Sequence, residues 1–180
     1  MHEDIRAILL TQEQIAARVQ EMGRQITEDY QGRELIVVVL LKGAAWFATD
    51  LTRAIDLPLR VDFMVASSYG DGTSTSGNVK VKLDIGEDIA GKDVLLIDDI
   101  IDSGVTFAAI GAMLRQCKPA TLKTAALCDK AERRINGLEA DYVGFKIPDE
   151  FVVGYGLDYA GDYRNLPYIG VLKPAVYARK

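Results

Sequence analysis

The strongest constraint on the fold is the unbroken apolar run LIVVVLLK at residues 35–42. β-Branched and leucine side chains without polar interruption are typical of a strand buried on both faces, as in parallel sheets covered by helices. A second run, VLLIDDI at 94–100, begins in the same way and then meets two acids. The chain therefore needs a sheet with helices packed over it.

Helical and extended patterns alternate along the rest of the chain. Thr11 and Gln14 resemble a capping box, and the apolar residues after them recur at helical spacing, which predicts a helix over about 12–30. The remaining patterns predict helices at 44–55 and 106–117, and strands at 59–69, 78–85, 122–128 and 141–147. This order predicts the α/β class, with a mainly parallel twisted sheet flanked by helices.

Length and charge limit the class of protein further. The 180 residues suit one domain, and we expect a core over about 11–147 with a small irregular hood mainly from about 148–180. The net charge of −5 argues against nucleic acid as a partner. No apolar stretch approaches the roughly 18 residues of a membrane span. The N-terminal segment lacks the pattern of a secretory signal, so a cytoplasmic location is expected.

Three features can be set aside as carriers of chemistry. Cys117 and Cys128 have neither zinc nor disulfide spacing, so both are expected to be small core residues. The single histidine, His2, lies near the terminus, away from any pocket that a catalytic imidazole needs. The segment GEDIAGKD at 86–93 nearly matches a phosphate-binding loop, but it ends in Asp93 and precedes a strand, so it predicts a turn.

The stretch VLLIDDIIDSGVT at 94–106 is the candidate for a site. Ligands bind beyond the carboxyl ends of parallel strands, and the loop DSGVT leads into a helix whose first N–H groups suit a phosphate. Acids beside a phosphate favour Mg²⁺, which prefers oxygen ligands. In the structural alternative, Asp102 and Ser103 cap the helix, while Asp98 and Asp99 pair with lysine or arginine.

The same stretch resembles the phosphoribosyl-pyrophosphate signature of type I phosphoribosyltransferases. From about residue 35 to 173 the chain is similar to the hypoxanthine phosphoribosyltransferases. This closer resemblance rests on LLKGAAWF at 40–47, VDFMVASSYG at 61–70, DK at 129–130 and IPDEFVVGYGLDYAGDYRNLPYI at 147–169. One departure is Asp98, where the family often has glutamate, which shortens the reach to the ribose hydroxyls by one methylene group.

The resemblance implies roles for the residues that match the family's motifs. It implies that Asp98 and Asp99 meet the ribose hydroxyls and a bridging Mg²⁺. The 5′-phosphate is assigned to the loop residues Asp102, Ser103, Gly104, Val105 and Thr106. The pyrophosphate is assigned to Leu41, Lys42, Gly43 and Arg164, with a non-proline cis peptide expected between the first two. A mobile lid over the reaction is assigned to the loop headed by Ser68 and Tyr69.

The base pocket is likewise implied by the resemblance. Phe151 is expected to stack on a purine, the backbone of Val152 to meet its edge, and Lys130 to donate to the 6-oxo group. Asp158 is expected near the base, where it helps to hold a second Mg²⁺; Mn²⁺ is an expected substitute. Without the resemblance, Phe151 reads as a core residue and Lys130 as a solvated helix charge.

The implied reaction transfers the phosphoribosyl group from phosphoribosyl pyrophosphate to hypoxanthine, and to guanine, giving the nucleoside monophosphate and pyrophosphate. Asp102 is the candidate base for the proton that the purine loses, and a homodimer or homotetramer is expected. Two alternatives stay open. One is a nucleotide-sensing regulator of the same fold, against which Asp102 and the negative charge count. The other is a transferase for another base such as xanthine; Lys130 favours a 6-oxopurine over adenine.

Overall fold

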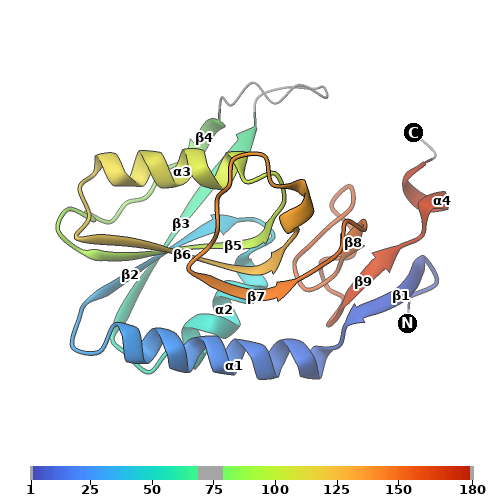
Figure 1. The fold of residues 1–180 in the computed structure, drawn as a ribbon, viewed down its shortest axis with the longest axis horizontal. Coiled ribbons are helices and arrows are strands. Elements are labelled where there is room, and N and C mark those ends of the chain that lie inside the picture. The colour runs from blue at the N-terminus through green and yellow to red at the C-terminus, as the bar shows by residue number, and fades with distance from the viewer. Residues whose placement is uncertain (1, 69–78, 179–180) are drawn as a thin grey trace.

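A six-stranded sheet forms the centre of the computed structural model, which describes residues 2–68 and 79–178 (Figure 1). Its order is β4-β3-β2-β5-β6-β7. The strands are β2 (Leu35–Leu41), β3 (Leu59–Ser68), β4 (Val79–Leu83), β5 (Asp93–Ile101), β6 (Thr121–Asp129) and β7 (Tyr142–Lys146). Every neighbouring pair is parallel except β3 and β4, which pair antiparallel at the edge. The prediction of a mainly parallel α/β sheet is confirmed.

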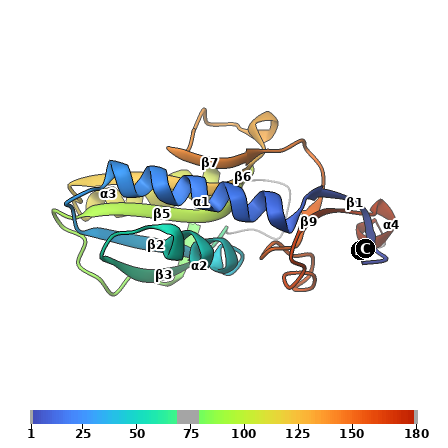
Figure 2. The same cartoon turned by 90° about the horizontal axis from the view of Figure 1, so that it is seen from below.

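Helices cover both faces of this sheet. α1 (Gln12–Asp29) and α2 (Ala45–Ala54) lie on one face and α3 (Val105–Gln116) on the other (Figures 1 and 2). Alternate residues of β2 enter the two cores: Val37 and Val39 join the α1 and α2 side, and Val38 and Leu40 the α3 side. This burial explains why the run has no polar position.

Local signals placed most of these elements correctly. The capping box at the start of α1 is present: the Thr11 hydroxyl accepts the Gln14 N–H at 3.3 Å, and Gln14 Oε1 accepts the Thr11 N–H at 2.8 Å. The segment 86–93 is a loop that enters β5, as predicted. The expectation for the cysteines was half wrong, because Cys128 is buried but Cys117 is exposed directly after α3.

The hood contains a small antiparallel sheet at one end of the molecule (Figure 2). Its strands are β1 (Ile5–Leu10), β9 (Ile169–Leu172) and β8 (Val152–Val153), in that order, and the short helix α4 (Pro174–Tyr177) follows β9. The sequence patterns did not predict β1, whose partner lies about 160 residues further along the chain. The N-terminal segment thus joins the hood that was expected mainly from 148–180.

No helix among the described residues has the length and apolar character needed to cross a membrane.

Candidate active site

Two adjacent acids lie near the carboxyl end of β5. Asp98 and Asp99 belong to the strand itself, which continues to Ile101, and both are half-buried. Backbone N–H groups turn the carboxylates: Asp98 Oδ1 accepts the Asp99 N–H at 2.9 Å, and Asp99 Oδ1 accepts the Ile100 N–H at 2.8 Å. These bonds hold the two carboxylates at the edge where ligands of parallel sheets bind.

The surroundings of Asp98 and Asp99 disfavour the ionised forms of their carboxyl groups. Burial and then the neighbouring charge of Asp99 raise the pKa of Asp98 well above its usual value. Burial also raises the pKa of Asp99, against the weaker opposing effects of hydrogen bonds and of Arg164. Within residues 2–68 and 79–178, neither acid forms an ion pair with lysine or arginine. The structural alternative, in which cationic side chains neutralise both acids, is therefore wrong for this pair.

The loop 41–43 packs directly on Asp99. The Leu41–Lys42 peptide is cis, as the resemblance implied. A Cβ atom on Gly43 would lie 1.6 Å from Asp99 Oδ2, so only glycine fits there. On the other side, a Cβ on Gly156 would lie 2.1 Å from the Gly43 carbonyl oxygen. The loop is thus wedged between the acids of β5 and a turn of the hood.

The loop between β5 and α3 forms the wall of a cavity of about 200 Å³. Gly104 is the N-cap residue of α3; it has a φ of 82° and no side chain with which to cap the helix. Ser103 Oγ accepts the Val105 N–H at 3.4 Å, whereas Asp102 makes no capping contact. The lining includes Asp98, Asp102, Ser103, Gly104 and Thr106. The predicted phosphate loop and one of the two acids therefore meet in one cavity.

The Asp102 carboxylate faces an arginine that the sequence patterns did not single out. Arg133 Nε lies 3.0 Å from Asp102 Oδ1. Arg133 also approaches Asp149 at 3.6 Å, and Asp149 lies 3.7 Å from Lys130 Nζ. An alternating row of charges thus joins the candidate base to the predicted base-reading lysine. The Lys130 side chain is only 8% exposed, so the view of it as a solvated charge is wrong.

The aromatic residue assigned to the base lies at the hood surface. Phe151 is 38% exposed, so it is not a core residue. Its ring stacks on Tyr177 at 4.9 Å and meets the edge of Tyr159 at 5.5 Å. Val152, the next residue, is buried in β8. The hood therefore offers an exposed aromatic ring beside a backbone strand.

Two further predicted residues pair with each other. Arg164 Nη2 lies 2.7 Å from Asp158 Oδ1, and Arg164 Nη1 donates to the Gly156 carbonyl at 2.6 Å. Asp158 Oδ2 accepts the Gly161 N–H at 2.8 Å. Asp158 thus has a cationic partner, in contrast to Asp98 and Asp99. In the part of the chain that the structure describes, no three acidic, histidine or cysteine side chains gather into one metal site.

Most of the predicted lid lies outside the described residues. Ser68 ends β3, where its backbone pairs with Val79, and Tyr69 with the loop 70–77 lies outside the described residues.

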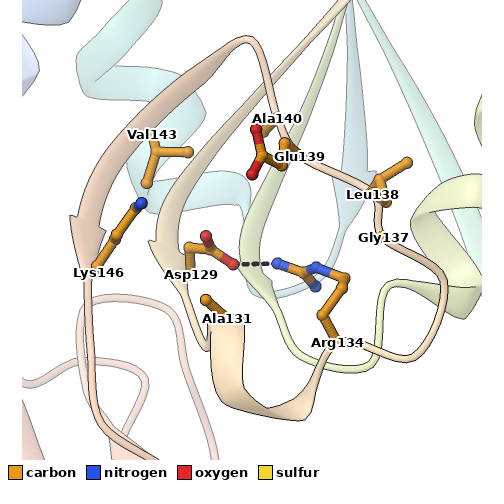
Figure 3. A pocket seen from close by; sticks show the side chains of 9 residues that line it. All are labelled: Asp129, Ala131, Arg134, Gly137, Leu138, Glu139, Ala140, Val143 and Lys146. Atoms are coloured by element: carbon orange, nitrogen blue, oxygen red, sulfur yellow. Dashed lines mark hydrogen bonds and ion pairs between the residues drawn. The ribbon is translucent and has the colours of Figure 1, made fainter.

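A second cavity, of about 310 Å³, was not foreseen from the sequence (Figure 3). The Arg134 guanidinium points at the Asp129 carboxylate within it, and both side chains are less than 10% exposed. The remaining lining residues are Ala131, Gly137, Leu138, Glu139, Ala140, Val143 and Lys146. The buried ion pair connects the end of β6 to the segment that follows it.

Fold and site together define an α/β protein with a cavity beside an acid pair at the carboxyl edge of its parallel sheet. Residues 6–160 match the family described as the phosphoribosyl transferase domain. The chain belongs to this family, within its hypoxanthine phosphoribosyltransferase branch, as the following relatives indicate.

Relatives of this branch match the chain over nearly its whole length. A hypoxanthine-guanine phosphoribosyltransferase of Staphylococcus aureus is 51% identical over 99% of both chains. The bifunctional protein TilS/HprT of Listeria innocua is 49% identical over 99% of this chain, which spans 28% of that relative's length. A crystal structure of hypoxanthine phosphoribosyltransferase from S. aureus superimposes with a TM-score of 0.96 at 51% identity, covering 98% of this chain and 96% of that one. The Trypanosoma cruzi enzyme gives 0.94 at 40% identity, with coverage of 99% and 96%.

Proposed function

We propose that the protein transfers the 5-phosphoribosyl group from phosphoribosyl pyrophosphate to hypoxanthine, and also to guanine, releasing pyrophosphate. The observation that carries this proposal is the acid pair Asp98 and Asp99, which lacks a cationic partner among the described residues; Asp98 lines a cavity together with the loop 102–104 and the first turn of α3. Relatives named for this activity support it. The test is a turnover assay with phosphoribosyl pyrophosphate, Mg²⁺ and a panel of nucleobases, in which turnover of no base at all would refute it.

The acid pair fits a divalent cation. Two adjacent carboxyl groups whose pKa values are raised by burial are stabilised in their charged form by a bound cation, and Mg²⁺ is commonly held by one or two carboxylates plus substrate oxygens. When bound, Mg²⁺ would neutralise charge on the leaving pyrophosphate. Asp98 and Asp99 would hold it, and Asp158 would contribute to a second ion. Excess chelator should abolish turnover, and Mg²⁺ or Mn²⁺ should restore it.

The protein's own groups would position the rest of the substrate. The N–H groups at the start of α3, with residues 102–106, would hold the 5′-phosphate by their partial positive charge. The backbone of Leu41, Lys42 and Gly43 would meet the pyrophosphate, together with Arg164. Because Gly43 touches Asp99, the pyrophosphate loop and the acid pair are placed by the same contact.

Asp102 would accept the proton that the purine loses. A carboxylate at this position can also stabilise the positive charge that develops at the ribose C1′. Its side chain is 44% exposed and makes no capping bond to α3, so it is available to a substrate. The ion pair with Arg133 must loosen or rearrange when a purine enters.

A flat purine would lie between the hood and the charge row. Phe151 would stack on its face, the Val152 backbone would meet its edge, and Lys130 would donate to the 6-oxo group. Lys130 supports a 6-oxopurine, which leaves xanthine as the alternative substrate that the nucleobase panel resolves. A nucleotide-sensing regulator is the other alternative; it would bind nucleotide without turnover.

We propose in addition that the protein is a cytoplasmic homodimer or homotetramer. Val61 and Phe63 of β3 and Leu83 of β4 share one sheet face by their strand pairing, and they are 40%, 43% and 50% exposed. Exposed apolar side chains gathered on one face are typical of subunit contacts. Analytical ultracentrifugation of the wild type and of Phe63→Glu tests this, and a monomeric wild type would refute it.

A further inference from the structure

The four consecutive carbonyl groups of residues 101–104 are all hydrogen-bonded by one segment, residues 130–136, which we name the carbonyl clasp. The Lys130 N–H donates to the Ile101 carbonyl at 3.0 Å, and the Ile135 N–H donates to the Ser103 carbonyl at 3.3 Å. Two side chains complete the set. Arg134 Nη1 donates to the Asp102 carbonyl at 2.6 Å, and Asn136 Nδ2 donates to the Gly104 carbonyl at 3.0 Å.

These bonds fix the direction of the phosphate-loop N–H groups. In a trans peptide, the carbonyl of one residue and the N–H of the next point to opposite sides. Because the carbonyls of Asp102 and Ser103 point to the clasp, the N–H groups of Ser103 and Gly104 point away from it. The Gly104 carbonyl is shared between Asn136 and the Ala108 N–H of α3, at 3.0 and 2.9 Å. Successive N–H groups turned to one side form an anion-binding concavity. The clasp therefore prepares the side of the loop that would receive a phosphate.

Arg134 is held in place by a second contact. Its Nη2 atom pairs with Asp129 Oδ1, and the two side chains are 8% and 9% exposed (Figure 3). The planar guanidinium presents its two ends to two acceptors at once, one on β6 and one on the phosphate loop. A lysine ammonium in this place has a different shape and lacks the fixed fork. The pair thus ties the phosphate loop to the end of β6.

The clasp and the loop are also in tight steric contact. A Cβ atom on Gly104 would lie 2.7 Å from Asn136 Oδ1 and 2.9 Å from Arg134 Cδ. The loop therefore has no room to shift toward the clasp, and a shift away would break the carbonyl bonds. The same clasp begins at Lys130, so it also joins the phosphate loop to the proposed base pocket.

We propose that Arg134 and Asn136 are positioning residues that set the affinity for the 5′-phosphate of phosphoribosyl pyrophosphate. Neither residue touches the substrate in this proposal; both act through the carbonyls of the phosphate loop. The proposal rests on the proposed function, because it takes residues 102–106 as the phosphate site.

The decisive variant is Asn136→Ala, which leaves the Arg134 ion pair intact. We expect the KM for phosphoribosyl pyrophosphate to rise about 2- to 10-fold, the equivalent of one hydrogen bond, with the KM for hypoxanthine and kcat changed less than about twofold. Asn136→Asp keeps the oxygen that accepts the Leu138 N–H at 3.2 Å but removes the donor to Gly104, so it should show the same loss or a larger one. Arg134→Lys should raise the same KM by about 10-fold or more.

Glu132→Ala is the matched control, since this exposed residue lies in the same segment outside the contacts described above. It should leave both KM values unchanged. Binding of ribose 5-phosphate, measured by calorimetry, provides a second measurement that needs no turnover, and it should weaken by the same factor in Asn136→Ala. Unchanged binding there, or a parallel rise of both KM values, would overturn the proposal. A wild type that binds ribose 5-phosphate but turns over no base would refute the proposed function alone.

Discussion

Acids near the amino ends of the central strands, here called the amino-end edge, have different hydrogen-bond partners from Asp98 and Asp99 near the carboxyl ends, here called the carboxyl-end edge. At the amino-end edge, Asp29 accepts bonds from the Tyr142 hydroxyl at 2.5 Å and from Lys123 at 3.2 Å. Asp93 accepts the Thr121 hydroxyl at 2.5 Å, and Asp141 accepts the Thr124 hydroxyl and N–H at 2.8 Å. The Tyr142 hydrogen bond, followed by Lys123, holds the pKa of Asp29 below its usual value.

At the carboxyl-end edge, the surroundings of Asp98 and Asp99 disfavour their charged forms. Burial raises the pKa values of Asp98 and Asp99, the charge of Asp99 raises that of Asp98 further, and no cationic side chain among the described residues pairs with them. An acid that serves the fold is supplied with donors by the fold itself. An acid that serves a ligand is left to be completed by that ligand. Asp102 and Asp129 at this edge do pair with arginines, so the missing cation distinguishes Asp98 and Asp99 and not the edge as a whole.

The largest effect should come from Asp102→Asn at the carboxyl-end edge. If Asp102 is the general base, kcat should fall by roughly 10²- to 10⁴-fold, the usual range for losing such a group. The melting temperature should change little, because the N-cap residue of α3 is Gly104 and not Asp102. The ion pair between Asp102 and Arg133 is also half-exposed, so its loss should cost little. Asp141→Asn is the matched change at the other edge and should leave kcat near the wild-type value. Similar kcat values for Asp102→Asn and the wild type would break the distinction between the edges.

A smaller effect is expected for Lys130→Ala. Loss of the donor to the 6-oxo group should lower kcat/KM for hypoxanthine by about 1.5–3 kcal/mol of transition-state stabilisation, as for a hydrogen bond to a charged group. The matched change at the amino-end edge is Lys123→Ala, which should leave kcat/KM unaltered. A rise in the KM for phosphoribosyl pyrophosphate, with that for hypoxanthine unchanged, would contradict the role of Lys130.

The stability of the two edges should respond to pH with opposite sign. A carboxyl whose pKa is raised on folding contributes stability that is present below its unfolded pKa and is lost as pH rises through the folded pKa. Asp98→Asn removes this loss, so with chelator present it should unfold at higher temperature than the wild type at pH 7.5, by about 1 kcal/mol in free energy. The difference should shrink as pH falls toward 4. Thermal unfolding between pH 4 and 8 measures it, and a less stable Asp98→Asn at pH 7.5 would contradict the unpaired state of the acid.

The smallest effect is expected for Asp29→Asn. Because the folded pKa of Asp29 is lowered, its contribution is present above the unfolded pKa and is lost as pH falls through the folded value. The variant should be less stable than the wild type at pH 7 by less than about 1 kcal/mol, since the Asp29 side chain is 39% exposed. The free energies of unfolding of Asp29→Asn and of the wild type should converge below about pH 4. A stabilised Asp29→Asn would show that the acids of the two edges do not differ.

The sequence predicted the parts of the site that follow one another along the chain. The acids of β5, the loop 102–106 and the start of α3 are consecutive, so their order alone places them at the carboxyl edge of a parallel sheet. The remaining assignments, such as Phe151 and Arg164, came from resemblance to a family. The patterns could not find Arg133, Arg134, Asn136 or Asp149, because a charged or amide side chain in a polar segment looks the same whether it meets solvent or a partner.

The apolar periodicities of the sequence by themselves determined the alternation of strands and helices, and hence the mainly parallel sheet, because burial on one or both faces selects side chains at regular spacing. Tertiary structure alone determined which hydrogen-bond donors contact each acidic side chain. Tyr142 reaches Asp29 across 113 residues, β1 pairs with β9 across the whole chain, and the carbonyl clasp meets its loop across about 30. Such contacts form only when the packed core brings distant segments together, and they leave no periodic trace in the sequence. The donors that Asp29, Asp93 and Asp141 find, and the lack of a cationic partner for Asp98 and Asp99 among the described residues, are decided at that level.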